Sequence, residues 1–330
     1  MESFYSPSTP TPPSTPSSPT PPSSPSIPST PSSPSSPTSP SSPTLPQLLR
    51  YDLGTGVTAF STTRHGGCGT GTYGTFNINR YCGDSPQAIA ANRQALCHLL
   101  GISDDRLIMP HQTHQTKVVH IDEAFMALTA SERQSALEGV DALTTCLSGV
   151  CIGVSTADCI PVLLYDAEHH ATCAIHAGWR GTLQRIVQKA VRAMVDSYGT
   201  QPAALRAQIG PGISLDSFEV GDEVYDAFCQ QGFDMAPISR RYPSAHSGEK
   251  WHIDLPTCNR LQLTDAGLRP DHIVCAPVCT YRQCDDFFSA RRLGINSGRV
   301  FTGIVLTRAR AKKVPTFCNN SLTYARQAWR

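Results

Sequence analysis

The segment from Ser6 to Pro46 consists almost entirely of Ser, Thr and Pro and carries no charged side chain. It holds 16 of the 27 prolines, and Ile27 and Leu45 are its only large apolar residues. A segment of this composition cannot bury a core, so we expect a disordered tail with a polyproline II bias. The 330-residue chain therefore divides into a Ser/Thr/Pro-rich tail, 1–46, and one large folded domain, 47–330.

The charge balance and the cysteine content narrow the class of protein. The chain has 27 Lys and Arg against 26 Asp and Glu, a net charge of +1, which disfavours a nucleic-acid binder or a protein held on an anionic membrane. Its 13 cysteines, an odd number, favour reduced thiols over a disulfide framework. Since neither a signal peptide nor a membrane span is readable, we expect a cytoplasmic protein, and a monomer and a dimer are equally compatible with the sequence.

Short apolar runs and helical patterns alternate after the tail. Three runs, 150–155, 161–165 and 171–176, are separated by turn-sized gaps, which predicts adjacent strands in the middle of one sheet. The remaining pattern predicts helices over 85–100, 182–198, 221–228 and 255–268, strands over 57–63, 205–209, 272–276, 287–290 and 299–306, and a polar insertion over 239–250. Elements mixed in this way, without a repeat, favour an α+β fold with mixed central sheets flanked by helices.

Three residues that could hold a metal lie at predicted element ends. His114 lies in a loop, and Cys159 and His176 flank the predicted hairpin of 161–165 with 171–176. Antiparallel pairing returns the second strand to the start of the first, so Cys159 and His176 are expected to meet. Imidazole and thiolate are ligands that Zn²⁺ prefers, and three protein ligands with an open fourth position are typical of a catalytic zinc.

The same residues allow other interpretations at this point. Cys159 could be a small buried hydrophobe, with the histidines bonded to the backbone. It could also be a nucleophile activated by His176, with Asp158 or His114 orienting the imidazole, which would indicate acyl transfer. Copper is a third possibility, although the 5 methionines of the chain offer no evident axial thioether.

Two further segments carry candidate chemistry. Arg64 stands beside a glycine-dense loop, where a guanidinium and backbone N–H groups could hold a phosphate, although a surface arginine on a turn is the more common arrangement. Cys275, Cys279 and Cys284 are spaced too irregularly for a tight zinc knuckle, so we interpret them as structural thiols.

A series of segments, in order along the chain, resembles the laccase-domain family. The segments are Phe60-Ser61-Thr62-Thr63-Arg64-His65-Gly66-Gly67, Asn92-Arg93, Gln112-Thr113-His114, Thr156-Ala157-Asp158-Cys159-Ile160-Pro161-Val162, His176-Ala177-Gly178-Trp179-Arg180-Gly181, Ile209-Gly210-Pro211-Gly212-Ile213 and Phe287-Phe288-Ser289-Ala290-Arg291-Arg292. This family, formerly described as multicopper polyphenol oxidase-like, is now regarded as purine nucleoside phosphorylases that also deaminate adenosine. The resemblance covers residues 50–308, and its fold is similar to that of certain cysteine-dependent deamidase toxins.

The resemblance implies a zinc-dependent enzyme acting on purine nucleosides and phosphate. It implies that His114, Cys159 and His176 bind one Zn²⁺ per chain and that Arg64 contributes to an anion pocket. We further expect Asn92, Trp179 and Arg180 to contact substrate, and Asp158 and His111 are the candidates for proton transfer, with His111 equally compatible with a solvated loop histidine.

The chain departs from the family pattern at three places, and alternatives remain open. Gln115 stands where family members usually have Gly, Ala290 where an aromatic residue is usual, and Ser297 where Thr is common. The latter two bear on pocket shape and not on metal binding. The alternatives are a cysteine hydrolase using Cys159 and His176, a copper-dependent polyphenol oxidase, and a zinc-stabilised interaction module whose Ser/Pro-rich tail recruits partners.

Overall fold

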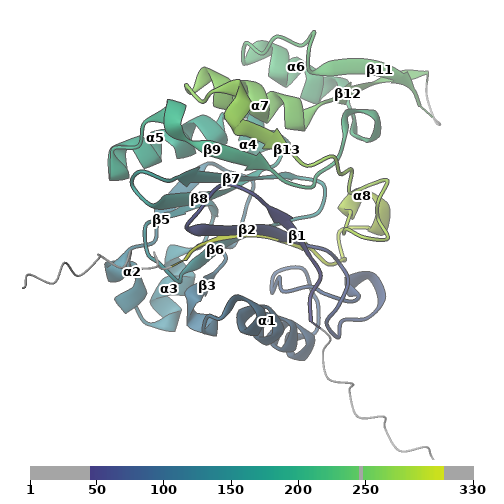
Figure 1. Cartoon of the computed structure of the whole chain (residues 1–330). Coiled ribbons are helices and arrows are strands. Elements are labelled where there is room, and N and C mark those ends of the chain that lie inside the picture. The colour runs from purple at the N-terminus through teal and green to yellow at the C-terminus, as the bar shows by residue number, and fades with distance from the viewer. Residues whose placement is uncertain (1–44, 245–247, 308–330) are drawn as a thin grey trace, which may run out of the picture. The chain divides into compact units, whose positions relative to one another are not determined.

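The computed structural model of the chain describes residues 45–244 and 248–307 (Figure 1). The predicted tail, apart from Leu45 and Pro46, lies outside these residues, as does 308–330. Within them, the chain forms two large mixed β-sheets, a small third sheet and eight α-helices. None of these helices is long and apolar enough to cross a membrane.

The larger sheet has six strands in the order β13-β9-β7-β8-β5-β4. Its strands are β4 (Lys117–His120), β5 (Val140–Thr145), β7 (Ile160–Asp166), β8 (Ala171–Ala177), β9 (Arg206–Ile209) and β13 (Ile273–Cys275). The outer pairs β13–β9 and β4–β5 are parallel, and the inner pairs are antiparallel. The predicted hairpin is present as β7 and β8 at the centre of this sheet.

The second large sheet has five strands in the order β1-β2-β14-β6-β3. Its strands are β1 (Leu48–Tyr51), β2 (Val57–Thr62), β3 (Leu107–Ile108), β6 (Cys151–Thr156) and β14 (Val300–Leu306). The last strand, β14, lies between β2 and β6 and pairs antiparallel with both. Strands from the two ends of the described chain are therefore neighbours in one sheet.

The two sheets pack face to face, and helices cover their outer faces. Side chains alternate along β7: Val162 and Leu164 point to the helix side, whereas Leu163 packs between the sheets with Ile152 of β6 and Ile304 of β14. This burial of both faces explains why β5, β6, β7, β8 and β14 are buried along their whole length.

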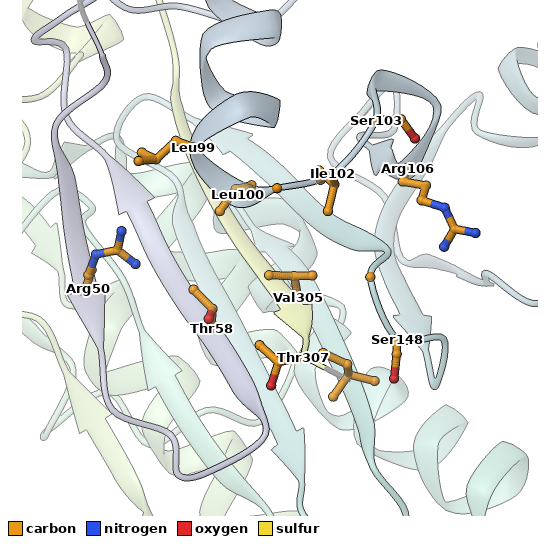
Figure 2. A pocket seen from close by; sticks show the side chains of 13 residues that line it. Arg50, Thr58, Leu99, Leu100, Ile102, Ser103, Arg106, Ser148, Val305 and Thr307 are labelled. Carbon is orange, nitrogen blue, oxygen red and sulfur yellow. The ribbon is translucent and has the colours of Figure 1, made fainter. Parts of the chain in front are cut away.

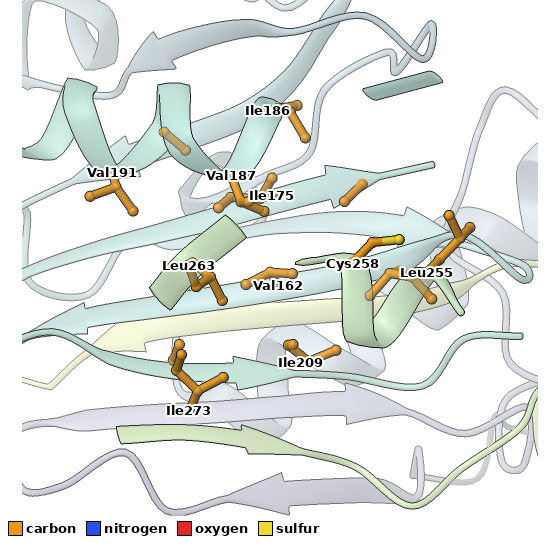
Figure 3. Packing of buried hydrophobic residues seen from close by; sticks show 14 of the residues in the cluster. Val162, Ile175, Ile186, Val187, Val191, Ile209, Leu255, Cys258, Leu263 and Ile273 are labelled. Atoms are coloured by element: carbon orange, nitrogen blue, oxygen red, sulfur yellow. The ribbon is translucent and has the colours of Figure 1, made fainter. Parts of the chain in front are cut away.

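Helices α5 (Ile186–Tyr198) and α7 (Leu255–Asp265) cover the six-stranded sheet (Figure 3). Val187 and Val191 of α5 and Leu263 of α7 pack with Val162 and Ile175 of the sheet. Full burial of each such side chain stabilises the fold by about 1.5–3 kcal/mol before conformational entropy is considered. This face is therefore committed to the core.

Helix α1 (Pro86–Leu100) covers the outer face of the five-stranded sheet, with Leu96 among its buried residues. Ser85 caps its first turn by accepting the Ala88 N–H, and the left-handed Gly101 ends it by donating to the carbonyls of Cys97 and His98. The predicted helix over 85–100 is confirmed, because the sequence held both signals that bound a helix.

Short elements complete the fold. The remaining helices are α2 (Glu123–Ala127), α3 (Ala130–Ala136), α4 (Trp179–Leu183), α6 (Asp222–Gln230) and α8 (Ala290–Leu293). A third sheet, in the order β10-β12-β11, contains β10 (Glu219–Val220), β11 (Ser239–Pro243) and β12 (Glu249–Ile253).

The structure corrects four predictions about elements. The run over 150–155 is not beside the hairpin in one sheet, because β6 pairs with β14 and β3 in the other sheet. The predicted helix over 182–198 is interrupted at Arg185, whose left-handed φ of 63° separates α4 from α5. The polar insertion over 239–250 pairs into the hairpin β11–β12. Residues 287–289 form a loop that leads into α8, which begins at Ala290, so no strand forms over 287–290.

Candidate active site

Cys159 and His176 are brought together by the register of the central hairpin. Cys159 lies in the loop that crosses from β6 in one sheet to β7 in the other. In the hairpin, Ile160 pairs with Ala177 and Pro161 with His176, so Cys159 faces the end of β8. The predicted meeting of Cys159 and His176 is confirmed, and it occurs where the two sheets exchange a connection.

His114 is held by a buried carboxylate on a neighbouring strand. Asp141 of β5 is fully buried and accepts hydrogen bonds from the backbone N–H groups of His114 at 3.0 Å and Gln115 at 2.8 Å. These bonds support His114 in a left-handed conformation with φ of 62°. Such backbone is costly for a residue with a side chain unless its surroundings enforce it, and it is concentrated at functional sites.

The same carboxylate accepts a hydrogen bond from Nδ1–H of His176 at 2.7 Å. This bond selects the tautomer of His176 whose Nε2 carries a lone pair. One ligand atom each of His114, Cys159 and His176 lies within 4.8 Å of the other two, and Sγ of Cys159 is 3.8 Å from Nε2 of His114. Among residues 45–244 and 248–307, this is the only group of three such side chains.

The electrostatics of the group favour a thiolate. Burial opposes ionisation of Cys159, but the imidazoles of His176 and His114 outweigh it and lower the pKa of the thiol. Burial also opposes a charge on His176, but the Cys159 thiolate and the Asp141 carboxylate outweigh it and raise the pKa of the imidazole. A thiolate beside two imidazoles is a donor set that suits Zn²⁺.

A glycine packs directly against the group. A Cβ placed on Gly178 would lie 3.0 Å from Sγ of Cys159 and 2.9 Å from Cδ2 of His114, closer than real Cβ contacts. The glycine thus leaves the space that both side chains occupy. The segment from His176 to Gly181 therefore supplies one ligand and the clearance for the other two.

The three side chains line a cavity of about 250 Å³. The other residues of its wall are Asn79, Tyr81, Cys82, His111, Gln112, Ser155, Thr156, Ala157, Ala290, Ile295 and Arg299. His111 donates from Nδ1 to Glu138 at 2.7 Å, and its ring stacks on that of Tyr81 with the centroids 4.1 Å apart. Polar and apolar groups thus converge beside the His/Cys group, as in small-molecule sites.

A larger cavity of about 600 Å³ lies elsewhere (Figure 2). Arg50 and Arg106 stand on opposite sides of it, and Leu99, Leu100 and Val305 line it between them. None of its lining residues belongs to the His/Cys group, and none is a histidine, cysteine or carboxylate. Size alone therefore does not indicate the site, and the smaller cavity is the better candidate.

Arg64 and Asn92 do not line the smaller cavity. Arg64 donates to the carbonyls of Gly74 at 2.9 Å and Cys284 at 2.6 Å, and it stacks over Phe288. Asn92 is fully buried and bonds to the backbone of the glycine loop, donating to the Asn77 carbonyl at 3.0 Å. Both residues hold loops in place and lie outside the wall of this cavity, and their contact with phosphate or substrate stays a prediction.

Asp158 also has a structural position. Its two carboxylate oxygens accept hydrogen bonds from Oγ1 of Thr280 and the backbone N–H of Arg291, each at 2.7 Å. Its side chain is outside the wall of the cavity, and a catalytic role of Asp158 stays a prediction. Trp179 and Arg180 are outside it as well, with the guanidinium of Arg180 4.1 Å above the Trp179 ring.

Four residues of the site were not anticipated from the sequence: Asp141, Glu138, Tyr81 and Arg299. Asp141 carried a usable signal, because an aspartate inside an apolar strand is costly unless it is paired. Glu138, Tyr81 and Arg299 reach the cavity region from separate loops, so no spacing along the chain connects them to His114 or Cys159.

Residues 58–307 match the protein family described as "Multi-copper polyphenol oxidoreductase laccase". The chain belongs to this family. The resemblance drawn from the short segments is thereby confirmed over the folded domain, and so is the α+β fold with mixed sheets.

Curated members of the family include close relatives of this chain. It is 46% identical over 250 residues to a purine nucleoside phosphorylase of Bacteroides thetaiotaomicron, a match that covers 76% of this chain and 92% of that protein. It is also 46% identical over 249 residues to Adenosine deaminase RL5 of an unknown prokaryotic organism, which covers 76% and 94% of the two chains.

A solved structure supports the architecture of this family member. The crystal structure of YlmD from Geobacillus stearothermophilus matches with a TM-score of 0.72 at 28% identity, over 80% of this chain and all of that one.

Proposed function

We propose that this chain is a zinc-dependent purine nucleoside enzyme. In phosphorolysis, an oxygen of phosphate bonds to the anomeric carbon of adenosine, inosine or methylthioadenosine, the bond to the base breaks, and the base leaves with a proton. In deamination, water replaces the amino group of adenosine, giving inosine and ammonia. The observation that carries this proposal is the convergence of three metal-ligand side chains on the cavity wall, in a relative of enzymes named for both reactions.

The donor set fits a catalytic zinc. His114, Cys159 and His176 would hold the ion, with Asp141 supporting both imidazoles. When bound, Zn²⁺ supplies Lewis acidity and favours ionisation of water at the position that protein ligands leave open. A blue-copper site would want an axial thioether, and no methionine lies on the wall of the cavity, so we propose zinc as the metal.

His111 is suited to moving a proton at the reacting atoms. Its Nδ1–H is engaged by Glu138, so its Nε2 is the atom able to take a proton, and the carboxylate stabilises the charged ring that results. The stack with Tyr81 fixes the plane of the imidazole. This pairing of a positioned imidazole with an orienting carboxylate supports a general acid/base role over that of a solvated loop histidine.

Arg299 places a positive charge at the cavity. It is the only lysine or arginine among the lining residues. Its Nη1 and Nη2 donate to the carbonyls of Ser297 at 2.6 Å and Ile295 at 3.0 Å, which hold the guanidinium in place. We propose that Arg299 attracts the phosphate or another anionic group of the substrate, the role that the sequence assigned to Arg64.

The test is product analysis with the zinc-loaded full-length chain. Adenosine and phosphate are incubated with the protein and products are separated by chromatography, beside Cys159→Ala. Adenine with ribose 1-phosphate demonstrates phosphorolysis, and inosine demonstrates deamination. Loss of both in a folded Cys159→Ala variant supports the site. A folded, zinc-loaded wild-type protein that turns over no nucleoside would refute the proposal.

A cysteine hydrolase is a second candidate, because Cys159, His176 and Asp141 are arranged in the order of a nucleophile, a base and an orienting carboxylate. Alkylation by iodoacetamide, followed at Cys159 by mass spectrometry, separates the candidates. A hydrolase should be modified at Cys159 whether or not zinc is added. A zinc enzyme should be modified after chelation and protected when zinc is restored.

A further inference from the structure

Large apolar side chains are exposed at only five positions in the described part of the chain: Leu45, Tyr81, Leu261, Val274 and Ile295. Two of them, Tyr81 and Ile295, line the cavity that contains the His/Cys group. We call this pair the apolar rim. Isolated exposed apolar residues need no explanation, but two on the wall of one small cavity indicate contact with an apolar part of a ligand.

Ile295 is 77% exposed, the highest value among these five side chains. It lies in the loop between α8 and β14, and this loop is not loosely attached. Arg299 donates to the carbonyls of Ile295 and Ser297, and Thr72 donates to the carbonyl of Asn296 at 2.7 Å. The backbone therefore holds an apolar side chain in water at the wall of the cavity.

Tyr81 contributes an aromatic ring to the same wall. His111 covers the ring on one side, at a centroid separation of 4.1 Å and an interplanar angle of 20°, and the residue stays 36% exposed. The imidazole beneath it is itself held by Glu138. Tyr81 is thus a flat surface with a fixed orientation, the geometry that suits stacking or edge contact with another aromatic ring.

We propose that Tyr81 and Ile295 bind the purine base and determine the preference of this enzyme for nucleosides with a large flat base. The inference rests on the proposed nucleoside function and assigns one part of the substrate to one part of the cavity. The base is the only part of a nucleoside whose faces are apolar and aromatic, whereas ribose and phosphate present hydroxyls and charge. The apolar side chains of the rim suit the faces of the base, and the positive charge of Arg299 suits the anionic group.

Product inhibition tests this assignment, because the two products of phosphorolysis separate the base from the sugar phosphate. The variants are Tyr81→Ala, Tyr81→Phe and Ile295→Ser in the zinc-loaded full-length chain. We expect Tyr81→Ala and Ile295→Ser to raise KM for adenosine and the inhibition constant of adenine about tenfold, the effect of losing about 1.4 kcal/mol of contact. Inhibition by ribose 1-phosphate should stay unchanged, and Tyr81→Phe, which keeps the aromatic ring, should restore most of the affinity for adenine that Tyr81→Ala loses.

Leu261→Ser and Val274→Ser are matched controls, since both side chains are exposed and neither lines the cavity. They should leave all constants unchanged. The assignment is overturned if adenine inhibits the rim variants as it inhibits wild type, or if inhibition by ribose 1-phosphate weakens equally. A wild-type protein without nucleoside turnover would overturn the function and this inference together. Normal turnover with unaltered adenine inhibition in both rim variants would overturn the inference alone.

Discussion

Asp141 and His176 form a buried pair in which a carboxylate oxygen lies 2.7 Å from Nδ1 of the imidazole. The side chains are 0% and 3% exposed, respectively. Because the same carboxylate also accepts the backbone N–H groups of the His114 loop, one side chain on β5 positions two of the three candidate metal ligands. The geometry of the site therefore depends on a residue that touches neither the metal position nor the cavity.

The first prediction concerns this residue. Asp141→Asn keeps the shape of the side chain but removes its charge and an acceptor for the His114 loop. Zinc affinity should fall about 10- to 100-fold, as is usual when an outer carboxylate of a metal site is replaced. Competition with a chromophoric chelator measures the affinity, and the visible spectrum of the Co²⁺-loaded protein should change because the ligands shift. Unaltered affinity in a folded variant would contradict the positioning role.

Gly178→Ala should damage the site without damaging the fold. The φ of Gly178 is −67°, which alanine adopts freely, so the only conflict is between the new Cβ and the side chains of Cys159 and His114. We expect weaker zinc binding and lower turnover, with the Tm of the metal-free protein changed by no more than a few degrees. A large drop in metal-free Tm together with normal zinc affinity would show that the glycine serves packing instead.

A pair of arginine variants separates an anion contact from a structural role. Arg299→Lys should raise KM for phosphate by about tenfold, because it loses the planar fork that suits an oxyanion. Arg64→Lys should lower Tm by disturbing the hydrogen bonds to the carbonyls of Gly74 and Cys284, and it should leave KM for phosphate unaltered in the folded fraction. Steady-state kinetics at varied phosphate concentration give KM for phosphate of both variants and so distinguish the two roles. The opposite result would restore Arg64 as the anion contact.

The sequence was sufficient to predict the central hairpin, because two apolar runs with a short gap can bury both faces only by pairing. It was insufficient to assign β6 to a sheet. A strand that is buried on both faces shows no alternation of polar and apolar residues. Its sequence therefore does not indicate which strands it pairs with, and the run over 150–155 was compatible with either sheet. The break at Arg185 was hidden for a different reason, since the left-handed residue there is not a glycine.

The sequence predicted the three ligands of the candidate site and His111 on the wall of its cavity, and it did not predict their supporting residues. His114, Cys159 and His176 were found because their chemistry is distinctive and the hairpin places two of them. Glu138 and Arg299 contribute through folding of distant loops around the cavity. Such contacts arise only in three dimensions, so chain order held no signal for them.

The last prediction concerns the turn that sets the register of the hairpin. Asp166, 1% exposed, ends β7 and accepts the backbone N–H groups of Glu168 and His169 as well as Nδ1–H of His169 at 2.9 Å. Burial opposes its ionisation, but the Thr200 hydroxyl and the hydrogen bonds from His169 outweigh burial and lower the pKa of the carboxyl. A carboxylate whose pKa is lower in the folded chain than in the unfolded chain stabilises the fold above the unfolded value, about 3.9, and this contribution disappears as the pH falls through the folded pKa.

Asp166→Asn should therefore lower the free energy of unfolding by about 1–3 kcal/mol at pH 7, the usual contribution of hydrogen bonds to a charged group. The difference from wild type should shrink as the pH falls from 5 to 3, because the carboxyl of Asp166 binds a proton in the unfolded chain before it does so in the folded chain. Urea unfolding of the metal-free protein at each pH measures this. Asp196→Asn is the control, since the exposed pair of Asp196 with Arg192 contributes little. A difference between wild type and Asp166→Asn that stays constant over this range would show that the turn depends on the shape of the side chain and not on its charge.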